Sequence, residues 1–117
     1  MNISLLVQGD PLSTNAPATA LQFARETVVE GHSLHRVFFY KSAVQLAHRF
    51  SSVPADETDL RSKWRTFADE SGTELAVCIA AAQRRGITED NIADGFSIVG
   101  LGQMVDAMLE SDRTVTF

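Results

Sequence analysis

The chain has 117 residues, and its 44% hydrophobic and 21% charged residues exclude a disordered protein, which would be poorer in apolar side chains. At this length we expect one domain over residues 1–117, because folding then buries roughly two-thirds of the surface of the unfolded chain. The formal net charge of -5 argues against direct binding of nucleic acid, since a phosphate backbone is held mainly by clustered Lys and Arg.

Targeting segments, disulfides and metal sites are not predicted. The apolar run from Ile3 to Val7 is too short for a signal peptide, and no stretch of about 18 apolar residues could span a membrane. A single cysteine cannot form an internal disulfide, and the three histidines at 32, 35 and 48 have no metal-ligand spacing near it. We therefore expect a cytoplasmic protein without a metal ion, and no membrane partner.

The first elements along the chain are a strand, a helix and a second strand. Residues 2–8 predict a strand, because they are almost continuously apolar and end at the turn signal Gly9-Asp10-Pro11. Small polar residues at 13–15 offer oxygens for a helix N-cap, and apolar residues at helical spacing continue to Gly31. Residues 33–40 predict the second strand.

The middle of the chain is predicted to be helical. A short helix is expected over 41–48, and the break at 51–54 is expected to be a mobile loop. Residues 56–70 return to a helical period with Leu60, Trp64 and Phe67 on one face. Trp64 is therefore expected to pack on the sheet.

The last part of the chain repeats the alternation of strand and helix. Strands are predicted over 74–79, 96–99 and 114–117, and a short helix over 80–86. A further helix over 101–109 is expected to point Met104, Val105 and Met108 inward.

This alternation predicts an α/β fold, a single-domain parallel β-sheet of about five strands flanked by helices on both faces. In such sheets, functional residues gather beyond the carboxyl ends of the strands. Here that edge includes the residues 8–10, Tyr40, the residues 78–80 and the turn at 99–100.

Cys78 is the candidate catalytic residue, because it lies at that edge where a strand meets a helix. Unpaired N–H groups at a helix start stabilise a thiolate and lower the pKa of a cysteine. The alternative is a cysteine that serves as a small core hydrophobe, and spacing alone favours this second interpretation. His32 and His35 are poor candidates for a general base, since they flank the opposite end of the second strand.

A set of short motifs resembles the TusD/DsrE family of sulfurtransferases across nearly the whole chain. The motifs recur in the family's order: Phe38-Phe39-Tyr40, Val77-Cys78-Ile79-Ala80-Ala81-Ala82, Arg84-Arg85-Gly86, Gly100-Leu101-Gly102 and Asp112-Arg113. The resemblance implies a DsrE-like fold. It also implies that Cys78, at the position of the family's active cysteine, accepts and passes on persulfide sulfur without an organic cofactor.

The resemblance also implies partners. TusD-like subunits assemble with TusB-like and TusC-like subunits, two copies of each in a hexamer, and relay sulfur from a TusA-like donor to a TusE-like acceptor for 2-thiouridine formation on tRNA. DsrE-like relatives carry sulfur in sulfur oxidation instead. A non-catalytic structural subunit of the same type of hexamer is the other alternative.

One departure from the family pattern follows the cysteine helix. Only four residues, 87–90, separate Gly86 from Asn91, where TusD-like relatives generally carry about a dozen more. Either the natural connection is short, or a disordered loop is absent from the chain. Because flexible loops often engage partners, this departure affects the identity of the partners more than the chemistry.

Two further motifs have ordinary structural interpretations. Gly100-Leu101-Gly102 lacks the third glycine of a dinucleotide-binding loop, so a tight turn that opens a helix is favoured over a nucleotide site. A flavodoxin-like phosphate site is disfavoured by the carboxylate of Asp10 in the loop after the first strand. Arg84 and Arg85 fit equally well as ligands of a persulfide anion or an acidic partner and as complements of a helix dipole.

Overall fold

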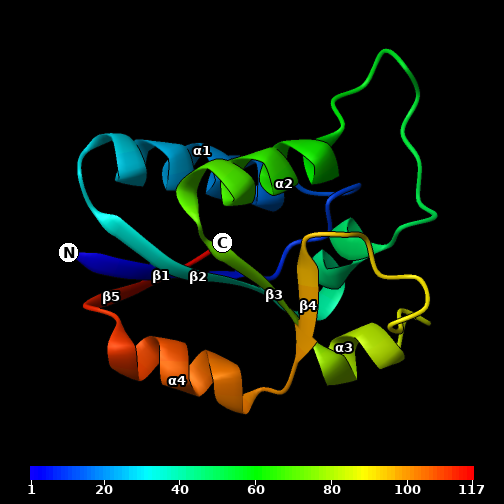
Figure 1. The fold of residues 1–117 in the computed structure, drawn as a ribbon. Coiled ribbons are helices and arrows are strands. Elements are labelled where there is room, and N and C mark those ends of the chain that lie inside the picture. Colours follow the sequence, from blue (N-terminus) through cyan, green and yellow to red (C-terminus); the bar gives the residue numbers. More distant parts are fainter.

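One parallel β-sheet organises the computed structural model, which describes residues 1–117 (Figure 1). The five strands lie in the spatial order β4-β3-β2-β1-β5. They are β1 (Asn2–Val7), β2 (Ser33–Phe39), β3 (Glu74–Cys78), β4 (Phe96–Val99) and β5 (Arg113–Thr116). The helices are α1 (Ala16–Val29), the 3₁₀ helix η1 (Lys41–Ala47), α2 (Leu60–Ser71), α3 (Ile79–Gln83) and α4 (Gly102–Glu110). The predicted fold class is confirmed, since α1 and α2 cover one face of the sheet and α3 and α4 lie on the other (Figure 1).

The face under α1 and α2 holds the aromatic part of the core. Trp64 is fully buried and meets the ring of Phe39 edge to face at 5.4 Å, so the predicted packing of Trp64 on the sheet is confirmed. Its indole N–H donates to the carbonyl of Pro17 at 3.1 Å, which ties α2 to α1. A buried indole that has both ring contacts and a hydrogen-bond partner stabilises this layer strongly.

The helix α2 begins four residues later than the predicted start at Asp56. Asp59 is the N-cap, and its carboxylate accepts hydrogen bonds from the backbone N–H of Ser62 at 3.1 Å and from its hydroxyl at 2.9 Å. The bond from the Ser62 N–H lowers the pKa of Asp59, because it favours the charged form. The N-cap residue therefore decides where this helix starts, although the helical spacing of the sequence begins earlier.

The helix predicted over 41–48 is the 3₁₀ helix η1. Its first bond runs from the N–H of Ala43 to the carbonyl of Tyr40, three residues back, at 3.1 Å. Lys41 has a positive φ of 51°, which is uncommon for a residue with a side chain. The chain therefore turns sharply at the carboxyl end of β2.

The inward face predicted for α4 is wrong at two of its three positions. Val105 and Met108 are 48% and 49% exposed, Met104 is partly buried, and Ala107 is the residue that packs inward. The helix is attached to the sheet by polar contacts: Arg36 donates to the carbonyl of Gln103 at 2.7 Å. Further contacts of this kind join Asn2 to Glu110 and Ser4 to Ser111. Because these contacts need a close approach, a small residue faces the sheet and larger apolar side chains point outward.

The short connection after Gly86 is packed against the end of η1. Ile87 is fully buried, and the backbone N–H of Arg49 donates to the carbonyl of Asn91 at 2.8 Å. The N–H of Ala93 likewise donates to the carbonyl of Ala47 at 2.7 Å. The connection between α3 and β4 is therefore held against the end of η1.

Candidate functional site

Cys78 is the last residue of β3 and the N-cap residue of α3, so the predicted place of Cys78 near the junction of strand and helix is confirmed, although the strand ends one residue before the predicted Ile79. Its side chain makes no capping hydrogen bond and is only 2% exposed, within the hydrophobic core cluster. The junction is therefore as expected, but the thiol is covered. Both interpretations of Cys78 keep support: the position suits a reactive thiolate, and the burial suits a core residue.

The strand register aligns four residues in a row across the carboxyl edge of the sheet. Val7 pairs with Phe39 and Phe39 with Val77, so the next residues, Gln8, Tyr40 and Cys78, lie side by side at the carboxyl ends of β1, β2 and β3. Cys78 itself pairs with Val99 on β4. The predicted clustering of these segments at one edge is confirmed. The row was not predictable from the sequence, because neither strand order nor register was known.

The two arginines after α3 differ in their surroundings. The guanidinium of Arg85 donates to the carbonyl of Ala81 at 3.0 Å and to the hydroxyl of Ser42 at 3.3 Å, which joins α3 to η1. Arg84 is exposed. Both follow the end of α3 that is opposite Cys78, and the contacts of Arg85 favour a structural role over a persulfide ligand.

The histidines do not reach Cys78. His35 lies at the start of β2, and its Nε2 atom is 3.0 Å from the carboxylate of Glu110, without the alignment of a hydrogen bond. The ring of His48 accepts the N–H of Phe50 at 3.1 Å, in the turn after η1. No three His, Cys, Asp or Glu side chains are placed so that they could hold a metal ion together.

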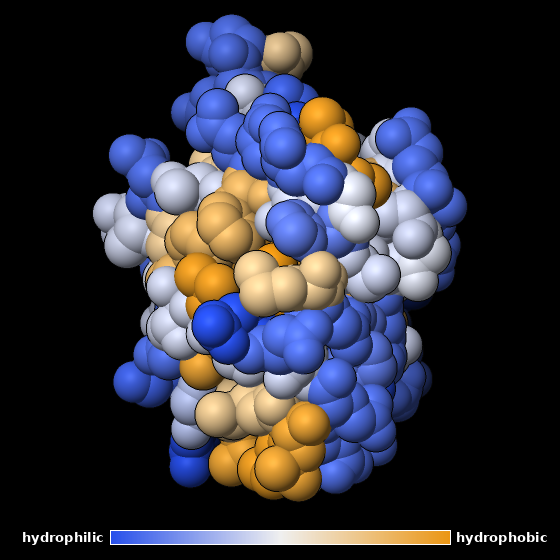
Figure 2. Space-filling view, turned by 90° about the vertical axis from the view of Figure 1, so that its left-hand side faces the viewer, coloured by the Kyte–Doolittle hydropathy of each residue, from blue (hydrophilic) through white to orange (hydrophobic).

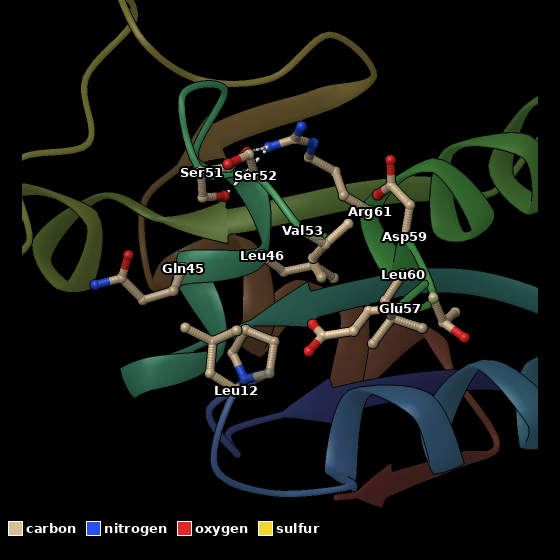
Figure 3. Close-up of a pocket in the computed structure, with 12 residues that line it drawn as sticks. Leu12, Gln45, Leu46, Ser51, Ser52, Val53, Glu57, Asp59, Leu60 and Arg61 are labelled. Atoms are coloured by element: carbon tan, nitrogen blue, oxygen red, sulfur yellow. Dashed lines mark hydrogen bonds between the residues drawn. The ribbon is translucent and has the colours of Figure 1, made fainter. Parts of the chain in front are cut away.

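A cavity of about 390 Å³ opens at the same edge, on the α1 and α2 side (Figure 3). Leu12, Leu46 and Leu60 supply apolar walls, and the loop after η1 closes it. Arg61 does not offer a free charge there, because it donates to the carbonyls of His48 and Ser51. Cys78 does not line this cavity. The sequence did not predict this cavity, although the turn signal that includes Pro11 and the break at 51–54 mark two segments that line it.

The turn at Gly100-Leu101-Gly102 opens α4, as predicted, but not for the predicted reason. Positive φ angles occur at other glycines and not at Gly100 or Gly102, and a Cβ atom at either position would meet no other atom within 4 Å. Neither glycine is therefore required by backbone geometry.

An apolar face of α4 points away from the sheet. We call this the outer face of α4: Leu101, Val105, Met108 and Leu109 are 45% to 80% exposed. Figure 2 shows apolar side chains gathered at the bottom of the molecule, where Figure 1 places α4. A helix whose exposed face is apolar is typical of an interaction surface.

Known proteins resemble this chain over its full length. A model of the DsrE/DsrF-like family matches residues 1–117. Two curated relatives are each named Sulfurtransferase TusD: the protein of Cronobacter sakazakii is 41% identical and that of an Enterobacter species 38%, each over 128 aligned positions covering all of both chains. Because the alignments are longer than this chain, each relative carries residues without a counterpart here.

Solved structures match the fold. The crystal structure of the ychN protein from E. coli has a TM-score of 0.86 at 20% identity, and it covers 100% of this chain and 99% of its own. A protein of unknown function from Methanobacterium thermoautotrophicum has a TM-score of 0.76 at 14% identity, with 97% of each chain covered. In this chain, no helix is both long and apolar enough to cross a membrane.

Proposed function

This chain belongs to the DsrE/DsrF-like family, and on that premise we propose that it carries sulfur as a persulfide on Cys78. It is a sulfurtransferase, like the full-length relatives at 38% to 41% identity. The observation that carries the assignment of Cys78 is its place: the only cysteine of the chain lies where β3 meets α3, at the carboxyl edge of a parallel sheet.

The transfer is a thiol exchange that needs no external oxidant or reductant. The Cys78 thiolate attacks the outer sulfur of a persulfide on the donor protein, the new bond forms between the two sulfurs, and the donor leaves as a thiolate. The same exchange in reverse order then passes the sulfur from Cys78 to an acceptor thiolate. The donor and acceptor we propose are TusA-like and TusE-like proteins, in the cytoplasmic relay that leads to 2-thiouridine in tRNA.

Access to the thiol requires a local movement, because Cys78 is 2% exposed. The elements that must move are short: α3 has five residues and is tied to η1 by Arg85. Local opening of a short segment costs less free energy than unfolding of the whole domain. We propose that docking of the donor or acceptor opens this junction.

The outer face of α4 supports the proposed assembly with TusB-like and TusC-like subunits, two copies of each in a hexamer. Its four apolar side chains would be covered by a related subunit, and the polar attachment of α4 to the sheet leaves no internal partner for them. A second candidate function, a structural subunit without transfer activity, is favoured by the burial of Cys78 in the core.

The deciding experiment compares wild type with Cys78→Ser. Both proteins are incubated with a persulfidated donor that carries radioactive sulfur, and they are analysed by non-reducing electrophoresis, peptide mass spectrometry and circular dichroism. We expect label on wild type only, one added sulfur on the Cys78 peptide that reductant removes, and equal folding of both. Equal labelling of both proteins would exclude Cys78 as the acceptor, and an unfolded variant would support the structural subunit.

A further inference from the structure

A phenol lies beside the thiol in the row across the carboxyl edge. Phe39 pairs with Val77, so Tyr40 and Cys78 are neighbours on adjacent strands, which lie about 4.8 Å apart in a β-sheet. Phe38 and Tyr40 lie on one face, with ring centroids 6.5 Å apart, and Phe38 pairs with Ala76. Because side chains alternate along a strand, Cys78 shares the face of Ala76 and hence of Tyr40.

The backbone of Tyr40 is held, while its hydroxyl is available. The N–H of Tyr40 donates to the carbonyl of Val7 at 2.9 Å, and its carbonyl accepts from the N–H of Ala43 at 3.1 Å. The ring is partly buried against Phe38, and no hydrogen bond within the protein holds the phenol oxygen. The Tyr40 hydroxyl is thus a polar group beside the row that no other protein group engages.

From this placement we propose that the hydroxyl of Tyr40 donates a hydrogen bond to the outer sulfur of the persulfide on Cys78. The inference rests on the proposed function and adds a residue to that site. The outer sulfur of a persulfide stands about 2.05 Å beyond the thiol sulfur, and side chains of neighbouring strands extend from the sheet in the same direction. The outer sulfur therefore lies farther from the sheet than the thiol sulfur, and closer to the height of the Tyr40 hydroxyl.

Tyr40 is the donor that the surroundings of Cys78 best supply. Arg85 is engaged with Ala81 and Ser42, and Arg84 lies beyond the other end of α3. Gln8 is one strand further away in the row. A hydrogen bond to an ionised sulfur lowers the pKa of the persulfide and lengthens its lifetime, since it stabilises the charged form.

The first test is Tyr40→Phe, which keeps the ring and its contact with Phe38 and removes only the hydroxyl. Sulfur is loaded from a persulfidated donor, and the rate at which the loaded protein is alkylated is measured against pH. We expect the midpoint of this profile to rise by about one pH unit, and the equilibrium constant for loading at neutral pH to fall about tenfold, the factor for one hydrogen bond to a charged group. A purely structural role would not move the pH midpoint.

The second test uses the fact that Tyr40 is the only tyrosine in the chain. Protein grown with carbon-13 tyrosine gives one set of ring signals in an NMR spectrum. We expect these signals to shift when Cys78 is loaded, because the added sulfur changes the surroundings of the ring. Cys78→Ser treated with the same donor should show no shift.

The outcomes separate this inference from the proposed function. If Tyr40→Phe loads and titrates like wild type and the ring signals do not respond, the role of Tyr40 is wrong, while the loss of loading in Cys78→Ser leaves the carrier function intact. If Cys78→Ser still loads, the carrier function itself fails. If Tyr40→Phe does not fold, the NMR measurement on the wild-type protein decides.

Discussion

The two faces of the sheet are built differently. Under α1 and α2 the sheet presents large apolar side chains, and Phe39, Trp64 and Phe96 meet edge to face. Under α3 and α4 the same strands present Arg36 and Cys78, and α4 is held by hydrogen bonds. The first face stabilises the fold by burial, whereas the second leaves polar and reactive groups at the carboxyl edge and an apolar helix face outside.

The largest expected effect on stability comes from removing a large buried side chain between α2 and the sheet. Trp64→Ala should lower the free energy of unfolding by about 3–5 kcal/mol, because it removes a fully buried indole and leaves a cavity between α2 and the sheet. Urea unfolding followed by circular dichroism measures this. Phe50→Ala, at a ring that is 69% exposed, is the control and should cost under about 1 kcal/mol. Similar losses in both variants would contradict the importance of this layer.

The second prediction separates stability from assembly. Val105→Asp puts a charge on the outer face of α4 and should weaken binding to co-expressed TusB-like and TusC-like subunits by more than about tenfold, because a charge buried at an apolar interface lacks a partner. Val28→Asp on α1 is matched in residue type and similar in exposure, 40% against 48%, and should leave assembly unchanged. Light scattering distinguishes these results, and equal behaviour of the two variants would refute the assignment of the interface.

A smaller effect is expected at the cap of α2. Asp59→Ala should cost about 1 kcal/mol near neutral pH, and Asp59→Asn should recover most of it, since asparagine also caps helices. Because folding lowers the pKa of Asp59, its contribution is complete above the ordinary value of about 3.9 and is lost as the pH falls through the lower folded value. Unfolding curves of wild type and Asp59→Ala should therefore converge in acid. A constant difference down to about pH 2 would show that the charge is not involved.

The smallest effect is expected at Gly102. The first residue of α4 has no neighbour that a Cβ atom would meet and no positive φ, so Gly102→Ala should be neutral or stabilising by up to about 1 kcal/mol. Thermal unfolding is the measurement. A loss of more than about 1 kcal/mol would show that the motif needs glycine after all.

Local sequence patterns predicted where the strands and helices lie in the chain, but they did not predict how these elements pack together. Almost continuously apolar runs such as residues 2–8 indicated strands, and Gly31 marked the end of the first helix, two residues beyond the last residue of α1. The prediction of which side chains of α4 face the sheet was wrong, because the spacing of apolar residues does not tell whether the sheet or another surface covers them. Here Ala107 and Met104 pack toward the sheet, and hydrogen bonds such as that from Arg36 to Gln103 hold the helix in this orientation.

The sequence by itself determined that a lone cysteine ends a buried strand and precedes a helix, because strand and helix signals are local properties of neighbouring residues. Only the tertiary structure decided that Cys78 is covered and that Tyr40 lies next to it. Both facts depend on the strand order and register, which join residues 38 positions apart, as in the pair Arg36 and Glu74. Pairing between distant segments is selected by the packing of the whole core, so no local pattern contains it.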